Sequence, residues 1–192
     1  SVREIKKMIE MGVIGEVLAC NIDRIGLKTD KVFDTGVKVD LGVHDYDLVS
    51  YLFHNPIKNF SVFCDKQENE DLSIANMYNW HVHFTLHQNR LSEYKRRRIE
   101  LVGIEGSITG DLINQTIVVN PGTVDSLKTL AECLGDKDVK MEGNEVVITL
   151  EKEEPLKNEI DAFIDAFLNN KSYHVTFEDG KRAIVLAWKE DF

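Results

Sequence analysis

The chain has 192 residues, 43% hydrophobic and 29% charged, which is enough for one compact core and excludes a disordered chain. Its 23 basic and 33 acidic side chains give a formal net charge of −10, the wrong sign for a nucleic-acid or anionic-membrane binder. The three cysteines form no CxxC pair, and an odd number cannot pair completely within one chain. We therefore expect one acidic domain over residues 1–192, cytoplasmic, with reduced thiols.

The N-terminal third predicts helix, strand, loop and helix. Apolar residues at helical spacing, followed by Gly12, predict a helix over residues 2–11. Residues 15–25 are β-prone, residues 26–36 are polar with two glycines, and a second helix is expected over residues 40–53. No apolar run approaches the roughly 18 residues of a membrane-spanning helix, so we expect no membrane partner.

From residue 57 to residue 150 the pattern changes to short β-prone runs, which favours antiparallel pairing. Residues 121–143 contain one proline and three glycines, and we expect an irregular excursion there, with one helical turn near residues 127–134. The predicted strands are 60–63, 77–86, 98–102, 107–109, 116–119 and 146–150.

The C-terminal part returns to helix. After Pro155, apolar residues recur at i, i+3, i+4 and i+7, which predicts a helix to Leu168 that packs on the sheet. Thr176 and Asp179 form a variant capping box that begins a last helix. The fold class is therefore α+β: an open, predominantly antiparallel mixed β-sheet with helices packed on one face.

The helix expected over residues 40–53 carries the side chains that could support chemistry. Four polar residues fall within one narrow arc at about 100° per residue: Asp40, His44, Asp47 and Tyr51. Asp and His four residues apart can hydrogen-bond, which orients the imidazole and favours its charged form. The alternative is that this stripe merely faces water, although a solvated face normally carries Lys and Glu.

The same segment resembles a motif of a known family. Residues 35–47, TGVKVDLGVHDYD, are similar to the Gly-rich Asp-x-x-x-His-x-x-Asp segment of the Gfo/Idh/MocA oxidoreductases, the relatives of glucose-fructose oxidoreductase and inositol dehydrogenase. Residues 10–17 (EMGVIGEV) resemble the family's G-x-I-G-E entry, residues 99–108 (IELVGIEGSI) its G-x-x-G hairpin, and residues 159–187 its closing helices. The resemblance spans the chain and implies the family's C-terminal domain, with its dihydrodipicolinate-reductase-like fold.

In that family this domain forms the substrate side of an NAD(P)-dependent dehydrogenase. The resemblance implies a sugar, sugar-nucleotide or cyclitol substrate that reacts at a hydroxyl or keto group, with NAD or NADP bound mainly by an N-terminal Rossmann domain. No GxGxxG follows a strand in these 192 residues, and no Glu-Lys-Pro segment occurs. We therefore expect no cofactor-binding residue here, no activity of the chain alone, and, from the start at Ser1, a segment of a longer protein.

The resemblance also implies roles for the four residues of the arc. His44 matches the family's acid-base histidine, and Asp40 matches the aspartate that orients it or binds a substrate hydroxyl. Oxidation of an alcohol requires the hydroxyl proton to leave, and a base that titrates near neutrality accepts it well. Asp47 matches the motif and either supports the helix or binds substrate, and Tyr51 is a substrate-binding candidate from its place on the arc.

A second group of polar residues lies in the strand predicted over residues 77–86. Its alternation places Trp80, Val82, Phe84 and Leu86 on one face and His81, His83, Thr85 and His87 on the other. A His-x-His pair can bind zinc, but the sequence nominates no third ligand, so we expect no metal site. We expect the second face to meet water or a partner subunit, and the resemblance implies a homo-oligomer, dimer or tetramer, formed through the sheet.

Two short motifs receive structural interpretations. The basic run at residues 95–98 is expected at a solvated sheet edge, with phosphate binding as the alternative. Residues 103–106 (GIEG) lack the strand-to-helix context of a phosphate loop and are expected to form a hairpin turn. For the chain as a whole, the alternative to the dehydrogenase is a non-catalytic oligomerisation or ligand-sensing module of the same fold.

Overall fold

The structure, a computed structural model, describes residues 1–28, 35–54, 59–65, 70–152, 154–171, 173 and 175–188. Its helices are α1 (Val2–Glu10), α2 (Val37–Asp40), α3 (Gly42–Phe53), α4 (Val124–Leu134), α5 (Pro155–Leu168) and α6 (Phe177–Trp188). Its strands are β1 (Val17–Leu27), β2 (Asn59–Cys64), β3 (Leu72–Tyr78), β4 (His83–Ser92), β5 (Arg96–Gly103), β6 (Gly106–Asp111), β7 (Thr116–Pro121), β8 (Lys140–Glu142) and β9 (Glu145–Thr149).

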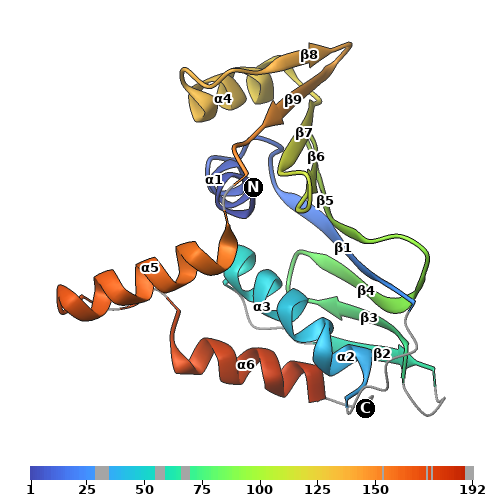
Figure 1. Cartoon of the computed structure of the whole chain (residues 1–192). Helices are drawn as coiled ribbons and strands as arrows, with labels where there is room; N and C mark the ends of the chain where they lie inside the picture. Colours follow the sequence, from blue (N-terminus) through green and yellow to red (C-terminus); the bar gives the residue numbers. More distant parts are fainter. Residues whose placement is uncertain are drawn as a thin grey trace.

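The nine strands of the described residues form one open sheet in the order β2-β3-β4-β1-β5-β6-β7-β9-β8 (Figure 1). β1 is parallel to β4, and every other neighbouring pair is antiparallel. Parallel pairing needs a crossover connection, and the one between β1 and β4 contains α2 and α3. The predicted mixed, predominantly antiparallel sheet is therefore confirmed.

The core lies between one face of this sheet and a layer of helices. Alternate residues of the central strands point into it, as the pleat requires, and α1, α3 and α4 cover them. α6 packs on α3 rather than on the sheet (Figure 1). The prediction of helices on one face is confirmed. Fully or almost fully buried side chains include Ile5, Cys20, Ile22, Tyr46, Phe84, Leu86, Ile99, Leu101, Ile108 and Ile117.

The prediction of a single strand over residues 77–86 is wrong, because the chain reverses between β3 and β4. The backbones of Asn79 and Val82 bond to each other at 3.1 Å, and the Asn79 side-chain oxygen accepts the Val82 N–H at 2.9 Å. Such an Asx bond stabilises a turn. Trp80 therefore lies in the turn, 60% exposed, and does not share the buried face of Phe84.

Two helix predictions differ from the structure in extent. The helix expected over residues 40–53 is divided at Leu41, where α2 ends and α3 begins. The irregular excursion over residues 121–143 contains the three-turn helix α4 and the short strand β8. Thr123 and Ser126 form a reciprocal capping box that begins α4, a signal that a search for Glu or Gln at the third position misses.

The prediction that the helix after Pro155 packs on the sheet is also wrong. α5 forms as predicted, but it extends away from the sheet (Figure 1), and Ala166 is its one buried residue among the described side chains. Its apolar stripe is consequently exposed.

The basic run at residues 95–98 does not lie at a sheet edge, which corrects that prediction. β5 is an inner strand between β1 and β6. Arg96 pairs with Asp23 at 3.1 Å and Arg98 with Glu100 at 3.7 Å. Arg97 lies opposite Arg24 in the register of β1 and β5, on the side of the helices.

The predicted hairpin turn at residues 103–106 and the predicted capping box at Thr176 and Asp179 are both confirmed. Gly103 faces Gly106 in the β5–β6 hairpin, and an added Cβ at Gly103 would overlap the carbonyl oxygen of Ile14. At the start of α6, the Thr176 N–H donates to Asp179 at 2.8 Å. None of the described helices is long and apolar enough to cross a bilayer.

Candidate functional site

The two residues that the motif nominates for chemistry lie on either side of the junction between α2 and α3. Asp40 is the last residue of α2, and His44 follows in the first turn of α3. Both reach the surface: the Asp40 side chain is 39% exposed, and His44 is also exposed. The two groups interact electrostatically, but no hydrogen bond joins them among the described residues. Asp40 and His44 are therefore neighbours whose charges interact, and Asp40 is hydrogen-bonded to Arg90 rather than to His44.

The surroundings of His44 favour its neutral form. Partial burial is the largest cause that lowers the pKa of His44, followed by the positive charge of Arg24 and, more weakly, that of Arg97. The carboxylates of Asp45 and Asp40 oppose this shift without reversing it. A neutral imidazole at pH 7 can accept a proton, as a general base must.

A buried ion pair lies beneath His44 and was missed at the sequence level. Asp45 has no exposure, Arg24 donates its Nε to Asp45 Oδ1 at 2.7 Å, and Gln88 donates to Oδ2 at 2.9 Å. Burial raises the pKa of Asp45, and Arg24 opposes that effect. The network joins α3 to β1 and β4 and so fixes the helix that carries His44.

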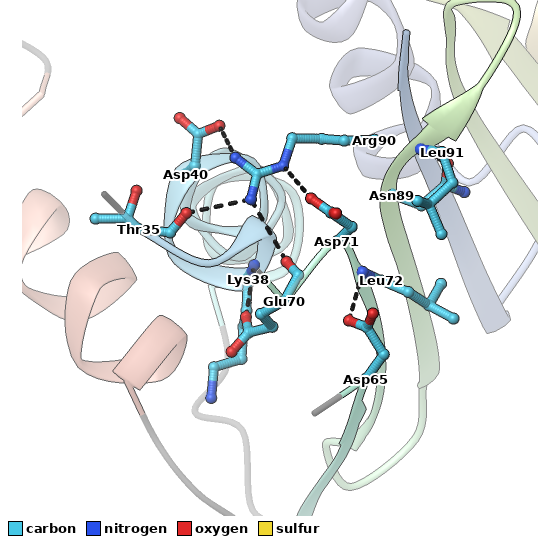
Figure 2. A network of polar contacts seen from close by, with 10 residues as sticks. All are labelled: Thr35, Lys38, Asp40, Asp65, Glu70, Asp71, Leu72, Asn89, Arg90 and Leu91. Atoms are coloured by element: carbon cyan, nitrogen blue, oxygen red, sulfur yellow. Dashed lines mark hydrogen bonds and ion pairs between the residues drawn. The ribbon is translucent and has the colours of Figure 1, made fainter. Parts of the chain in front are cut away.

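A second buried arginine holds the segment that carries Asp40 (Figure 2). Arg90 of β4, whose side chain is 4% exposed, donates its Nη1 to Asp40 Oδ2 at 3.4 Å and its Nε to Asp71 at 3.2 Å. Its Nη2 donates to the carbonyl oxygens of Thr35 at 3.2 Å and Glu70 at 3.5 Å. One guanidinium thus connects both ends of the α2 segment to the start of β3.

Glu70 strengthens this clamp from the other side of α2. Its carbonyl oxygen accepts the Val37 N–H at 2.8 Å, and its carboxylate accepts the Lys38 N–H at 3.1 Å (Figure 2). A Cβ at Gly36 would lie 2.5 Å from that carboxylate and would displace it. A side chain at residue 36 would therefore disturb the bond between the Glu70 carboxylate and the Lys38 N–H.

The other two predicted site residues lie further along α3, each beside a different helix. Asp47 faces α6: burial and the neighbouring Asp179 raise its pKa, while His44 and Arg182 oppose that rise. Tyr51 faces α1, where the Lys6 ammonium lies 4.0 Å from the centre of its ring. Asp40, His44 and Asp47 are thus electrostatically coupled, whereas Tyr51 is held at the far end of the helix.

The histidines of the second group do not converge. His81 lies in the turn, 3.5 Å from Glu16, whereas His87 on β4 lies 3.3 Å from Asp23 and 3.1 Å from Asn89. Across the described part of the chain, no group of three His, Cys, Asp or Glu residues is arranged to hold a metal ion.

The turn at residues 103–106 does not fit a dinucleotide phosphate site. The turn at residues 103–106 joins two strands, β5 and β6. It therefore presents no helix N-terminus, which a pyrophosphate would need. A hollow of about 450 Å³ does lie on the sheet, lined by polar residues such as Glu100, Thr109 and Asn120. These residues alternate with the buried ones, so the hollow opens on the face opposite the helices and away from His44.

Comparison with known proteins identifies the family. The profile of the oxidoreductase family's C-terminal α/β domain, the Gfo/Idh/MocA C-terminal domain, matches residues 6–188. Among curated proteins, none matches at a significant level.

Three solved structures of similar fold are much longer than this chain. UDP-N-acetylglucosamine 3-dehydrogenase GnnA from Acidithiobacillus ferrooxidans superposes with a TM-score of 0.76 at 16% identity, over 98% of this chain and 58% of that one. A structure described as a myo-inositol dehydrogenase from Sinorhizobium meliloti superposes with a TM-score of 0.69 at 19% identity, over 97% of this chain and 57% of that one. The scyllo-inositol dehydrogenase of Lactobacillus casei, with bound NAD(H) and scyllo-inositol, superposes with a TM-score of 0.66 at 16% identity, over 97% of this chain and 56% of that one.

The chain thus spans less than three-fifths of the length of these structures. At such identities the superpositions show a shared fold, whereas the family profile covers nearly every residue of the chain. The chain therefore belongs to the Gfo/Idh/MocA oxidoreductase family, as its C-terminal α/β domain.

Proposed function

We propose that this chain is the substrate side of an NAD(P)-dependent dehydrogenase that oxidises or reduces a hydroxyl or keto group of a sugar, sugar nucleotide or cyclitol. The observation that carries the proposal is the surface-reaching imidazole of His44, whose pKa is lowered, beside an Asp40 that Arg90 holds in place. Structures of UDP-sugar and inositol dehydrogenases share the fold and support this substrate class.

His44 is the acid-base group of the proposal. When an alcohol is oxidised, its O–H proton passes to a ring nitrogen of His44, and in the reverse direction the same nitrogen returns the proton to the carbonyl oxygen. The bound nicotinamide cofactor supplies the hydride exchange. Because residues 103–106 form a strand-to-strand hairpin and the sequence has no GxGxxG after a strand, the proposal assigns NAD or NADP to a domain outside these 192 residues.

Asp40 is the substrate-orienting group. Its Oδ2 accepts a bond from Arg90, and its partial exposure leaves the carboxylate accessible to a substrate hydroxyl. A carboxylate fixed in this way orients a polyol without taking the proton itself. Asp47 and Tyr51 extend the same helix and are proposed as further substrate contacts.

Self-association through the sheet is part of the same proposal. The face opposite the helices exposes Phe63, Tyr78 and Val102, which are 60%, 40% and 41% accessible. Burial of this face against a second copy would remove apolar surface from water.

A second candidate is a non-catalytic oligomerisation or ligand-sensing module of the same fold. It is favoured by one observation: Asp40 bonds to Arg90 rather than to His44, as a structural residue would.

The two candidates differ in redox activity. The complete polypeptide is assayed for NAD(P) reduction with a panel of sugars, UDP-sugars and cyclitols, and the 192-residue chain alone is titrated with NAD and NADP by calorimetry. The dehydrogenase proposal expects turnover of at least one compound by the complete polypeptide and no cofactor binding by the chain alone. No turnover across the panel would favour the module, and cofactor binding by the chain alone would contradict the division of roles.

A further inference from the structure

Arg97 lies on the helix side of β5, whereas the arginines before and after it point to the opposite face of the sheet. On that opposite face, Arg96 pairs with Asp23 at 3.1 Å. Arg98 pairs there with Glu100 at 3.7 Å. Arg97 itself is exposed, and no acidic side chain of the described residues forms an ion pair with it. Its positive charge therefore has no counter-charge within the described part of the chain.

Arg97 also interrupts the apolar inward face of its strand. Alternate residues of a strand share a face, and Ile99 and Leu101, which continue this one, are almost fully buried in the core. The residue opposite Arg97 on β1 is Arg24, and like charges directly opposite each other destabilise a strand pair. Arg24 is neutralised by Asp45 at 2.7 Å, whereas Arg97 has no such partner among the described residues. A position that breaks the local pattern without compensation indicates a functional role.

Arg97 lies near His44, at the same end of the helix side of the sheet. Arg24 connects the two: it is opposite Arg97 in the strand register, and it bonds to Asp45, the residue that follows His44 in α3. The positive charge of Arg97 also contributes to the lowered pKa of His44. Both side chains are exposed. A molecule bound at His44 therefore lies within the field of Arg97.

We infer that Arg97 binds an anionic group, a phosphate or a carboxylate, carried by the molecule that binds at His44. This inference rests on the proposed function in taking His44 as the place where the substrate binds. A guanidinium can donate two parallel hydrogen bonds to either oxyanion. The chain as a whole repels anions, since its net charge is −10, so an anionic ligand needs a local cation.

The inference narrows the substrate class of the proposed function. A neutral cyclitol has no group that would neutralise Arg97. A sugar phosphate, including the sugar phosphate part of a sugar nucleotide, carries its oxyanion one oxygen away from the ring, and a uronate carries its carboxylate directly on the ring. Either compound can place its anionic group at Arg97 while a ring hydroxyl lies at His44.

Ligand binding followed by NMR on the His44 ring tests this inference without any redox reaction. The complete polypeptide, as its gene encodes it, is titrated with glucose 1-phosphate, glucuronate or myo-inositol at constant ionic strength. A bound anion should raise the titration midpoint of His44, because a nearby negative charge favours the imidazolium form. We expect at least one of the two anions to raise it and myo-inositol to leave it unchanged. A response to glucose 1-phosphate alone would identify a phosphate, and a response to glucuronate alone a carboxylate.

Substitutions of neighbouring arginines show whether Arg97 is the binding group. Arg97→Gln should weaken binding of the active anion at least about tenfold, because it removes a charge-assisted hydrogen-bond donor. Arg97→Lys should recover part of this loss, because it keeps the charge without the planar guanidinium. Arg98→Gln is the matched control, since Arg98 is the next residue and points to the opposite face, and it should leave the Kd unchanged. The ligand-free midpoint of each variant is the reference for its own titration.

Three results would overturn the inference. They are no response of His44 to either anion, an equal response to myo-inositol, and an equal loss of anion binding in Arg97→Gln and Arg98→Gln. None of them depends on hydride transfer. Anion binding through Arg97 without turnover of any compound would support the inference and contradict the proposed dehydrogenase, whereas turnover of a neutral cyclitol with no anion binding would do the reverse.

Discussion

Arg24 donates its Nε to Oδ1 of Asp45 over 2.7 Å, and the carboxylate that it meets has no solvent exposure. The pair connects a central strand to the helix that carries His44, and Arg24 also lowers the pKa of that histidine. The geometry and the electrostatics of the candidate site thus depend on a pair that lies outside the polar arc of Asp40, His44, Asp47 and Tyr51.

Removal of the buried carboxylate should destabilise the fold strongly. Asp45→Ala leaves the Arg24 guanidinium, almost wholly buried, without its counter-charge, which costs about 3–5 kcal/mol. Urea unfolding followed by circular dichroism measures the free energy of unfolding. Asp125→Ala is the control, because Asp125 pairs with Lys128 at 2.9 Å on the surface, and its loss should stay below about 1 kcal/mol. Similar losses for both variants would contradict the importance of the buried pair.

His44 should titrate below the ordinary histidine value of about 6.5, because burial and two arginines disfavour its charged form. Its folded-state pKa is lowered. Between that lowered pKa and the ordinary value of about 6.5, the unfolded state therefore binds more protons than the folded state. His44 therefore removes stability as the pH falls through this window and removes none above it. NMR titration of the ring protons gives the midpoint directly.

The adjacent residues Arg97 and Arg98 provide a matched pair for this titration. Arg97 lies on the helix side of β5 and lowers the pKa of His44, whereas Arg98 points to the opposite face. Arg97→Gln should raise the midpoint of His44, and Arg98→Gln should leave it unchanged. Equal shifts in both variants would mean that the electrostatic account of His44 is wrong.

Loss of the Arg90 guanidinium should release the α2 segment. Arg90→Met removes the buried partner of two carboxylates that remain partly exposed, so we expect a loss of about 1–3 kcal/mol in unfolding free energy and faster hydrogen exchange in α2. Arg90→Lys should recover part of this loss. An ammonium keeps the charge, but it cannot reach all the partners of the planar guanidinium, whose Nε, Nη1 and Nη2 each donate to a different group. Unchanged exchange in α2 after Arg90→Met would show that the clamp does not hold Asp40.

Two glycines should respond to alanine in opposite directions. Gly103→Ala forces a Cβ into the Ile14 carbonyl, and we expect a destabilisation of about 1–3 kcal/mol or more. Gly180 in α6 has no atom within 4 Å of an added Cβ, so Gly180→Ala should stabilise by up to about 1 kcal/mol through helix propensity. Thermal unfolding compares the two, and a stable Gly103→Ala protein would contradict the close contact at the β5–β6 hairpin.

Local patterns predicted most of the secondary structure. The spacing of Ile5 and Met8 placed α1, and β-prone runs located the inner strands, because one buried face imposes a period on the sequence. The reversal at Asn79 was missed although its signal is present: an Asn followed by alternating residues suits both a continuous strand and an Asx turn. Periodicity does not distinguish these, but tertiary packing does.

The hydrogen bonds and ion pairs of Arg90 and Asp45 could not be predicted from the sequence, because their partners lie far apart along the chain. Arg90 meets Asp40 across 50 positions, and Gln88 meets Asp45 across 43, so no local window contains both partners. The arc argument selected the exposed Asp40 and His44 and passed over Asp45, which lies on the buried side. A charged residue on the inward face of a strand, such as Arg90 after Phe84, Leu86 and Gln88, is the one signal that could have found the clamp.

The proposed function requires that His44 transfer the proton while the cofactor binds elsewhere. In the complete polypeptide, kcat for an active sugar or cyclitol and the Kd of NAD(P) are measured for His44→Ala, with His81→Ala in the exposed turn as the control. We expect kcat to fall by a factor of about 10²–10⁴ for His44→Ala, with an unchanged cofactor Kd, and His81→Ala to have no effect. Retained turnover, or a parallel loss of cofactor affinity, would contradict it.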